Sequence, residues 1–166
     1  MPVLDVEHDL DRRTMTVTAR FDAPVERVWA LYADARRLER IWGPPGWPAT
    51  FLEHELVPGG RSHYYMTGPE GERADGVWRI VAVDEPRSFD LEDAFADASG
   101  TPDEEVGWAR MRAELEPDDG GTRLTLISTF TSVEQLQQML DMGMEEGLKE
   151  AMGQIDGVLA EQASAV

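Results

Sequence analysis

The side chains that could do chemistry in this chain are aromatic rings and methionine thioethers, which suit binding better than bond-making. They lie on segments expected to face the interior of a sheet or its mouth: Trp42, Trp47, Phe51, Tyr64, Trp78, Phe89 and Phe95, with Met66, Met111, Met139, Met142 and Met144. Aromatic rings form large rigid walls, and methionine adapts to irregular apolar surfaces. Plain core packing accounts for any one of them, and as a set they also suit the wall of a binding cavity.

Strand parity singles out two polar side chains for the interior. In 61–66, Ser62 and Tyr64 share a face with Met66, whereas the opposite face carries Arg61 and His63. Because successive side chains of a strand point to opposite faces, we assign the charge-free face inward. A buried tyrosine hydroxyl needs a hydrogen-bond partner, which could be a ligand carbonyl, a backbone group or water. Ser62 and Tyr64 are therefore the candidate polar contacts for a ligand.

The same rule places Trp78, Ile80 and Met111 on inward faces. Trp108 is the exception, because it shares a face with the charged Arg110. Its position at the start of a strand allows two interpretations, a cover over the cavity mouth or a surface anchor for a partner, and the sequence leaves both open.

Neither a metal centre nor a catalytic group is predicted. The three histidines, His8, His54 and His63, are far apart and follow no metal-ligand spacing. Its outward parity places His63 at the surface. No serine occupies a nucleophile elbow, no paired carboxylates stand in an apolar setting, and the chain has no cysteine. We therefore assign no catalytic residue, no metal and no cofactor.

The charge balance excludes several classes of partner. Lysine and arginine total 15 against 33 acidic residues, a formal net charge of −18. Nucleic-acid binding needs a basic stripe, and docking on anionic lipid needs basic residues. No apolar run approaches the roughly 20 residues of a membrane span, and the first residues do not resemble a signal peptide. We expect a cytoplasmic protein with no nucleic-acid partner and no membrane insertion.

The acidity has two further interpretations. Lys149 is the only lysine, so arginine supplies the rest of the positive charge. This composition is compatible with a salt-loving host or a GC-rich genome, and equally with an ordinary well-solvated acidic surface.

The elements that position these side chains follow from periodicity. Clean alternation predicts a strand over 14–21, and residues 1–13 form an N-terminal arm or an extra strand. Pro24 and Asp34 are start signals for two short helices. Turn signals then separate strands at 50–57, 61–67, 74–84, 87–95, 106–116 and 122–131. Ser132 and Gln135 form a capping box that opens one long helix to about residue 160, roughly 40 Å in length.

This order predicts a single α+β domain over residues 1–166. A curved antiparallel sheet must bury its apolar face, and the last helix must bury its apolar stripe. The simplest solution wraps the sheet around the C-terminal helix, with the two short helices closing one end.

The residues carry a family resemblance. The segments FDAPVERVWALYADARRLERIWGPPGW, VPGGRSHYYMTGPEGERADGVWRIVAVDEPRSF and LISTFTSVEQLQQMLDMGMEEGLKEAMGQIDGVL occur in the order of the START-like, birch-pollen-allergen-like (SRPBCC) superfamily. The combination of WGPPG, PGG and GMEEG resembles the branch named after the activator of the ninety-kilodalton heat-shock-protein ATPase. The resemblance covers about residues 14–160 and implies a helix-grip fold with a cavity between the sheet and the long helix.

Related families bind lipids, sterols, plant hormones or polyketides in that cavity, so the resemblance implies a small apolar ligand. We predict that the cavity is lined by Trp42, Trp47, Phe51, Ser62, Tyr64, Met66, Trp78, Ile80, Phe89, Phe95, Met111, Met139, Leu140, Gly143, Met144 and Gly147. Glycine inside a helix costs about 1 kcal/mol relative to alanine. Gly143 and Gly147 therefore indicate either close packing against the helix or space left for a ligand.

Three functions compete. The first is a module that binds a small hydrophobic or amphipathic molecule. The second is a co-chaperone-like regulator of the heat-shock protein, although the namesake carries an additional N-terminal domain for which this chain has no room. The third is an enzyme of the polyketide cyclase or dehydratase type, in which Tyr64 and a nearby carboxylate would move protons. Members of the class are often monomers or dimers, so a homodimer stays open.

Overall fold

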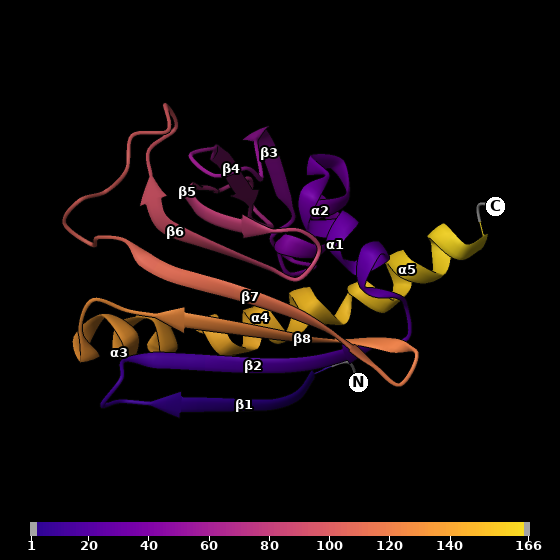
Figure 1. Cartoon of the computed structure of the whole chain (residues 1–166). Helices are drawn as coiled ribbons and strands as arrows, with labels where there is room; N and C mark the ends of the chain where they lie inside the picture. The colour runs from indigo at the N-terminus through magenta and orange to yellow at the C-terminus, as the bar shows by residue number, and fades with distance from the viewer. Residues whose placement is uncertain (1–2, 165–166) are drawn as a thin grey trace.

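The structure is a computed structural model that describes residues 3–164, so residues 1–2 and 165–166 of the predicted domain lie outside the described part. Two strands, two helices, six strands and three helices follow one another (Figure 1). The strands are β1 (Val3–Asp9), β2 (Thr14–Phe21), β3 (Ala49–His54), β4 (Arg61–Thr67), β5 (Arg73–Asp84), β6 (Ser88–Ala96), β7 (Ala109–Asp118) and β8 (Gly121–Thr129). The helices are α1 (Val25–Ala33), α2 (Ala35–Trp42), α3 (Val133–Asp141), α4 (Met144–Gly153) and α5 (Ile155–Ser164).

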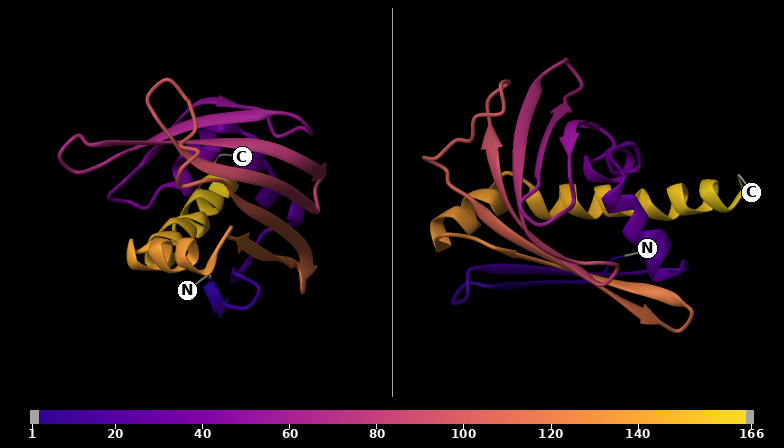
Figure 2. Two further views of the ribbon diagram at one scale, coloured as in Figure 1. Left: turned by 90° about the vertical axis from the view of Figure 1, so that its left-hand side faces the viewer. Right: turned by 45° about the horizontal axis from the view of Figure 1, so that its top comes forward.

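The strands form one antiparallel sheet in the order β1-β2-β8-β7-β6-β5-β4-β3. Figure 2 shows this sheet curving around the C-terminal helices, with α1 and α2 at one end. The prediction of an α+β fold with a curved antiparallel sheet, two short helices and a long C-terminal helical segment is confirmed. Residues 3–9 form the extra strand, which pairs with β2.

Local sequence explains the elements. In β2 the side chains of Met15, Val17 and Ala19 are buried, and the intervening threonines are half-buried. The carboxylate of Asp34 caps α2 by accepting hydrogen bonds from the backbone amides of Arg36 and Arg37. These elements bury one apolar core between the concave face of the sheet and the helices.

The prediction of one unbroken C-terminal helix is wrong. The Ser132 hydroxyl caps α3 as the capping box predicts, accepting a hydrogen bond from the Gln135 amide at 3.0 Å. Gly143 then takes a left-handed conformation with φ of 87°, which separates α3 from α4. Glycine tolerates this conformation because it has no Cβ. Figure 2 shows α4 and α5 continuing along one line beneath the sheet, with α3 set at an angle.

Two strand boundaries also differ from prediction. β3 ends at His54, and β7 begins only at Ala109. Before β7, the Asp103 carboxylate accepts hydrogen bonds from the amides of Glu105 and Val106. Such a turn offers the backbone partners that a strand would otherwise provide, so residues 103–108 form a loop.

Candidate functional site

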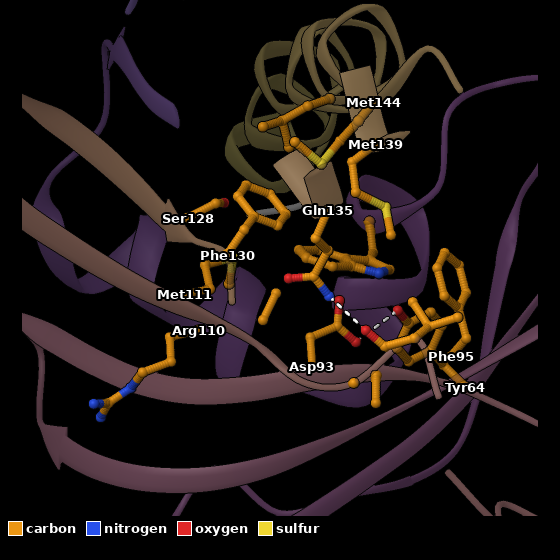
Figure 3. Close-up of a pocket in the computed structure, with 16 residues that line it drawn as sticks. Tyr64, Asp93, Phe95, Arg110, Met111, Ser128, Phe130, Gln135, Met139 and Met144 are labelled. Atoms are coloured by element: carbon orange, nitrogen blue, oxygen red, sulfur yellow. Dashed lines mark hydrogen bonds between the residues drawn. The ribbon is translucent and has the colours of Figure 1, made fainter. Parts of the chain in front are cut away.

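A cavity of about 170 Å³ lies between β4, β6, β7 and β8 of the sheet and the junction of α3 with α4 (Figure 3). It is partly open to solvent and mostly apolar. Its lining residues are Trp42, Tyr64, Asp93, Ala94, Phe95, Val106, Gly107, Ala109, Arg110, Met111, Ser128, Phe130, Gln135, Met139, Met144 and Leu148. The volume is close to that of an engineered apolar cavity of roughly 150 Å³ that binds benzene in another protein. The site can therefore hold a ligand about the size of one ring.

The structure brings six of the sixteen predicted residues together around this cavity. They come from α2, three strands and both sides of the α3–α4 junction, and they are Trp42, Tyr64, Phe95, Met111, Met139 and Met144. Strand parity placed Tyr64 and Met111 on the correct face. Phe95 keeps 40% of its surface exposed, because it stands at the mouth.

Four other predicted residues fill the core instead of lining the cavity. Phe51 stacks on Tyr64 with ring centroids 5.1 Å apart, and Trp78 meets Trp42 edge to face at 4.8 Å. Phe89 packs against rings of α1 toward another part of the core, and Ile80 is buried among the same apolar residues. These contacts are the reason that the hollow is small.

The remaining strand and loop residues are placed outside the cavity wall. The Ser62 hydroxyl is fully buried and lies 2.7 Å from Nδ1 of His54, so it serves a core hydrogen bond. Met66 packs at the edge of the core, and the Trp47 ring lies against Gly68 in the loop after α2.

Three predicted residues of the C-terminal helices also lie outside the cavity wall. Leu140 packs against the core beside the cavity. Gly143 forms the α3–α4 junction, and a side chain there would meet open space. Gly147 faces Pro44, whose Cγ would lie 3.7 Å from an added Cβ, an ordinary contact.

Asp93 is the acidic residue of the cavity wall that sequence reasoning missed. It lies on the cavity wall, where its Oδ1 accepts a hydrogen bond from the Tyr64 hydroxyl at 3.2 Å (Figure 3). The signal was present in the alternation of β6, because Asp93 shares its face with Phe89, Leu91 and Phe95. The pair joins a carboxyl group and a phenol inside an apolar site.

The environment changes the acidity of both groups. Burial raises the pKa of Asp93 to about 7, although the Tyr64 hydroxyl and the nearby Trp78 indole act to lower it. Among the described residues, the buried indole N–H groups of Trp42 and Trp78 make no well-formed hydrogen bond, although both lie near enough to the Tyr64 oxygen to lower its pKa. Burial, followed by the charge of Asp93, raises the pKa of Tyr64. Asp93 can therefore gain or lose a proton near neutral pH, whereas Tyr64 stays protonated.

Two other polar side chains of the wall, those of Gln135 and Arg110, are already committed or face elsewhere. The Gln135 amide accepts from the Thr131 backbone at 2.7 Å and donates to the Val106 carbonyl at 2.9 Å, which ties α3 to the 103–108 loop. The Arg110 guanidinium points away from the cavity in Figure 3. Within residues 3–164, no cluster of three or more acidic or histidine side chains could hold a metal ion.

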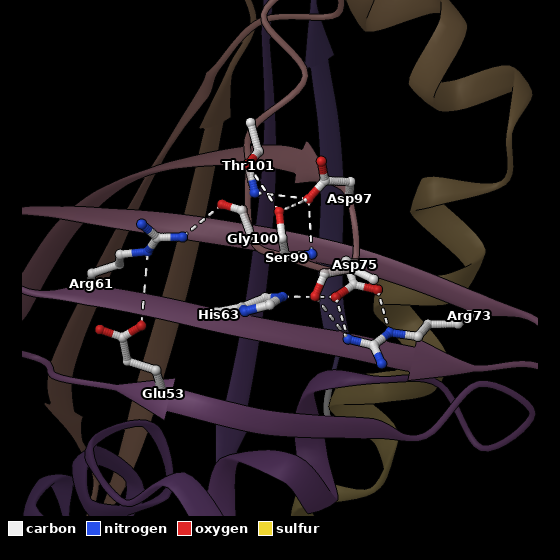
Figure 4. A network of polar contacts seen from close by, with 10 residues as sticks. Glu53, Arg61, His63, Arg73, Asp75, Asp97, Ser99, Gly100 and Thr101 are labelled. Atoms are coloured by element: carbon white, nitrogen blue, oxygen red, sulfur yellow. Dashed lines mark hydrogen bonds and ion pairs between the residues drawn. The ribbon is translucent and has the colours of Figure 1, made fainter.

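A second polar network lies on the outer face of the sheet, behind the cavity (Figure 4). The prediction that His63 is a surface residue is wrong: it is 8% exposed, and its Nε2 lies 2.7 Å from a carboxylate oxygen of Asp75. Arg73 donates two hydrogen bonds to the same carboxylate and is the main reason that the pKa of Asp75 is lowered. Arg61 donates to the Gly100 carbonyl at 2.6 Å and so fastens the 97–101 loop over His63.

Trp108 also belongs to the outer face. The Arg79 guanidinium lies 3.5 Å from the centroid of its ring, and its indole N–H donates to Glu104. The ring does not line the cavity, so the interpretation of Trp108 as a cover for the mouth is wrong.

Fold and comparison together define the class of protein. A curved antiparallel sheet around a C-terminal helical segment, with a cavity between them, is the helix-grip architecture of the START-like superfamily. The model of one of its families, described as activator of Hsp90 ATPase homolog 1-like protein, matches residues 22–160, and the chain belongs to this family.

Solved structures agree. Protein Ms6760 from Mycobacterium smegmatis is 52% identical, with a TM-score of 0.89 over 95% of this chain and 97% of its own. A protein from Arthrobacter aurescens is 49% identical, with a TM-score of 0.91 over 96% of this chain and 92% of its own. Ara h 8.0201, at 17% identity and a TM-score of 0.62 over 89% of this chain and 97% of its own, shares the fold alone.

No functionally curated protein matched the chain. Within residues 3–164, the helices are too short or too polar to cross a membrane.

Proposed function

We propose that the protein binds a small, mainly apolar molecule in the cavity beside the α3–α4 junction, with the polar group of that molecule at Asp93 and Tyr64. The observation that carries the proposal is the composition of the wall. Aromatic rings and methionines surround one carboxyl group, that of Asp93, which accepts a hydrogen bond from the Tyr64 hydroxyl. Sites for small molecules commonly combine an apolar wall with a few convergent polar groups in this way.

The size of the cavity limits the ligand. About 170 Å³ accommodates one ring or a short branched chain. A longer ligand would have to extend past Phe95, whose exposed ring stands at the mouth. We therefore expect small aromatic or short aliphatic molecules to bind better than long-chain lipids.

The test fills the cavity from the sheet side. Ala109 lies directly opposite Asp93 in the β6–β7 pairing, and Ala109→Leu places a larger apolar side chain in the hollow. Ala74→Leu makes the same change at an exposed position of β5 and is the matched control. Native mass spectrometry of the purified protein and protein-observed NMR with a library of small aromatic molecules measure binding.

The proposal predicts that wild type and Ala74→Leu bind members of the library, whereas Ala109→Leu loses at least tenfold in affinity while remaining folded. A folded wild-type protein that binds no member of the library would overturn it. Equal binding by Ala109→Leu would place the ligand elsewhere and would overturn the assignment of the cavity.

The Asp93–Tyr64 pair favours a second candidate, an enzyme that uses Asp93 as an acid or base. A carboxyl group with a pKa of about 7 can both accept and donate protons near neutral pH. If this candidate holds, Asp93→Asn should retain a ligand recovered from the wild type but stop its conversion. Unchanged ligand after prolonged incubation with wild type would exclude it for that molecule.

A further inference from the structure

We infer that the cavity selects a cationic ligand, a small aryl or alkyl amine whose ammonium group lies against the Asp93 carboxylate and the rings of Trp42, Tyr64 and Phe95. This inference rests on the proposed function and names the chemical class of its ligand. It differs from a neutral apolar guest and from a carbonyl compound that would accept a hydrogen bond from Tyr64.

The first argument is the missing counter-charge. Among the ion pairs of residues 3–164 none includes Asp93, and the one cationic side chain of the wall, Arg110, points away from the cavity. By contrast, Asp90, three residues earlier on β6, pairs with Arg112 at 2.7 Å on the outer face. A carboxylate inside an apolar site is costly unless it is paired. A ligand that carries its own positive charge would supply the partner.

The second argument is the number of acceptors that converge at one place. Tyr64 donates its only hydroxyl proton to Asp93, and its oxygen can accept in turn, with the Trp42 and Trp78 indoles lying near enough to lower its pKa. A carboxylate has room for about four hydrogen bonds; Tyr64 fills one, and the Trp78 indole and the Ala94 amide also lower the pKa of Asp93 as donors, which still leaves room for a ligand donor. An ammonium group has three donors and no acceptor, and it can therefore bond to both residues.

The third argument is the aromatic surroundings. Trp42 and Tyr64 lie edge to face with centroids 6.1 Å apart, and Phe95 and Phe130 complete the aromatic part of the wall. The negative faces of such rings attract cations, most strongly when water is excluded. The soft thioethers of Met139 and Met144 also line the cavity (Figure 3) and would contact the apolar part of the ligand.

The charge of the whole molecule acts in the same direction. A net charge of −18 raises the local concentration of cations and opposes the approach of anions. The long-range field and the local carboxylate therefore favour the same class of ligand.

The experiment compares probes of similar size but different head groups: benzylamine, benzyl alcohol, acetophenone and toluene. Titrations are followed by protein-observed NMR at about pH 8, where Asp93 is ionised and benzylamine is still protonated. A charge-assisted hydrogen bond inside a site is worth enough for a tenfold or larger difference. We expect benzylamine to bind at least about tenfold more tightly than the other three probes.

Two variants separate the effect of the Asp93 carboxylate from the effect of the net charge of the protein. Asp93→Asn should lower benzylamine affinity about tenfold or more and leave toluene within about twofold. Asp90→Asn changes the net charge equally but lies in the outer ion pair, so it should leave the preference intact. The comparison of probes on wild type stands even if Asp93→Asn does not fold.

The outcomes are distinguishable. Toluene or acetophenone binding as tightly as benzylamine would overturn this inference and leave the proposed function standing. Benzylamine binding that Asp93→Asn leaves unchanged would also overturn it. If none of the four probes binds to folded wild type, the cavity does not take one-ring guests, and the proposed function fails together with the inference.

Discussion

Asp93 and Tyr64 give the cavity its chemical character. Most of the wall would suit any apolar guest, but a carboxyl group beside a phenol imposes a demand for hydrogen-bond donors or charge. Burial also makes the site sensitive to pH, because it disfavours the charged form of Asp93.

Asp93→Asn should change how stability depends on pH. Burial raises the pKa of Asp93 from 3.8 in the unfolded chain to about 7 in the folded one, so the folded state holds the proton more tightly. Ionised Asp93 therefore lowers the unfolding free energy above about pH 7. This penalty disappears as the pH falls toward about 4, where the carboxyl group is protonated. As the pH rises from about 4 to above 7, the difference in unfolding free energy, wild type minus Asp93→Asn, should therefore fall by at most about 4 kcal/mol.

Urea denaturation of both proteins at several pH values measures this difference. Taking the difference cancels the titration of carboxylates such as Asp75, whose pKa is shifted in the opposite direction. A difference that is constant over the range would contradict the assignment of a buried, titrating Asp93.

Gly76 is the residue that gives the Tyr64 ring its place. It lies opposite Tyr64 in the β4–β5 pairing, and an added Cβ would overlap the tyrosine hydroxyl and ring. Gly76→Ala should therefore lower the unfolding free energy by about 1–3 kcal/mol and disturb the bond to Asp93. Gly157→Ala on α5 is the control, because a Cβ there meets open space. Equal unfolding free energies for the two variants would count against this account.

At the scale of single residues, the sequence correctly predicted that Tyr64 faces inward, but it did not predict Asp93, the carboxyl group that Tyr64 contacts. Tyr64 was found because its neighbours on the same face are uncharged. Asp93 was missed because Asp90 and Glu92 precede it on the wet face, and a lone carboxylate is normally solvent-exposed. His63 failed for a related reason: parity cannot show that the distant 97–101 loop covers an outer face.

At the scale of elements, the α3–α4 junction offers a matched pair of glycines. Gly143→Ala introduces a side chain at φ of 87°, a conformation that L residues avoid, and should destabilise by about 1–2 kcal/mol. Gly147→Ala sits in an ordinary helical turn with one van der Waals contact to Pro44, and it should stabilise by up to about 1 kcal/mol. Urea denaturation compares them, and effects of the same sign would refute the distinction.

Periodicity predicted most elements well, because each strand and helix buries one face. The limits of 61–67 were correct, and most other strand limits fell within a few residues. The break at Gly143 was not predicted, because apolar residues at helical spacing give the same sequence pattern whether the helix is continuous or bent. The size of the cavity escaped for another reason: it depends on how Phe51, Trp78 and Ile80 share space, which is a property of tertiary packing.

At the scale of the whole molecule, the excess of acidic residues should make stability depend on salt. The described ion pairs are mostly exposed and individually worth little, whereas the net charge of −18 produces general repulsion. Raising NaCl from low concentration to about 1 M should stabilise the fold by about 1–2 kcal/mol, or roughly 2–8 °C in Tm.

Thermal unfolding followed by circular dichroism measures the effect of salt. Sucrose at matched osmolality is the control, because it stabilises by exclusion from the surface and screens no charge. A Tm that falls with NaCl, or that rises no more than with sucrose, would show that repulsion does not limit stability.

Gly143, between α3 and α4, allows the angle between the two helices to set the size of the cavity. Met139 lies on α3 and Met144 on α4, so two helices that can differ in orientation both contribute to the cavity wall. A change in the angle between α3 and α4 would enlarge or narrow the cavity and would leave the hydrogen bonds within the helices and the sheet unchanged. Under the proposed function, a different backbone angle at Gly143 would change the size of ligand that fits, without repacking the aromatic core beside the cavity.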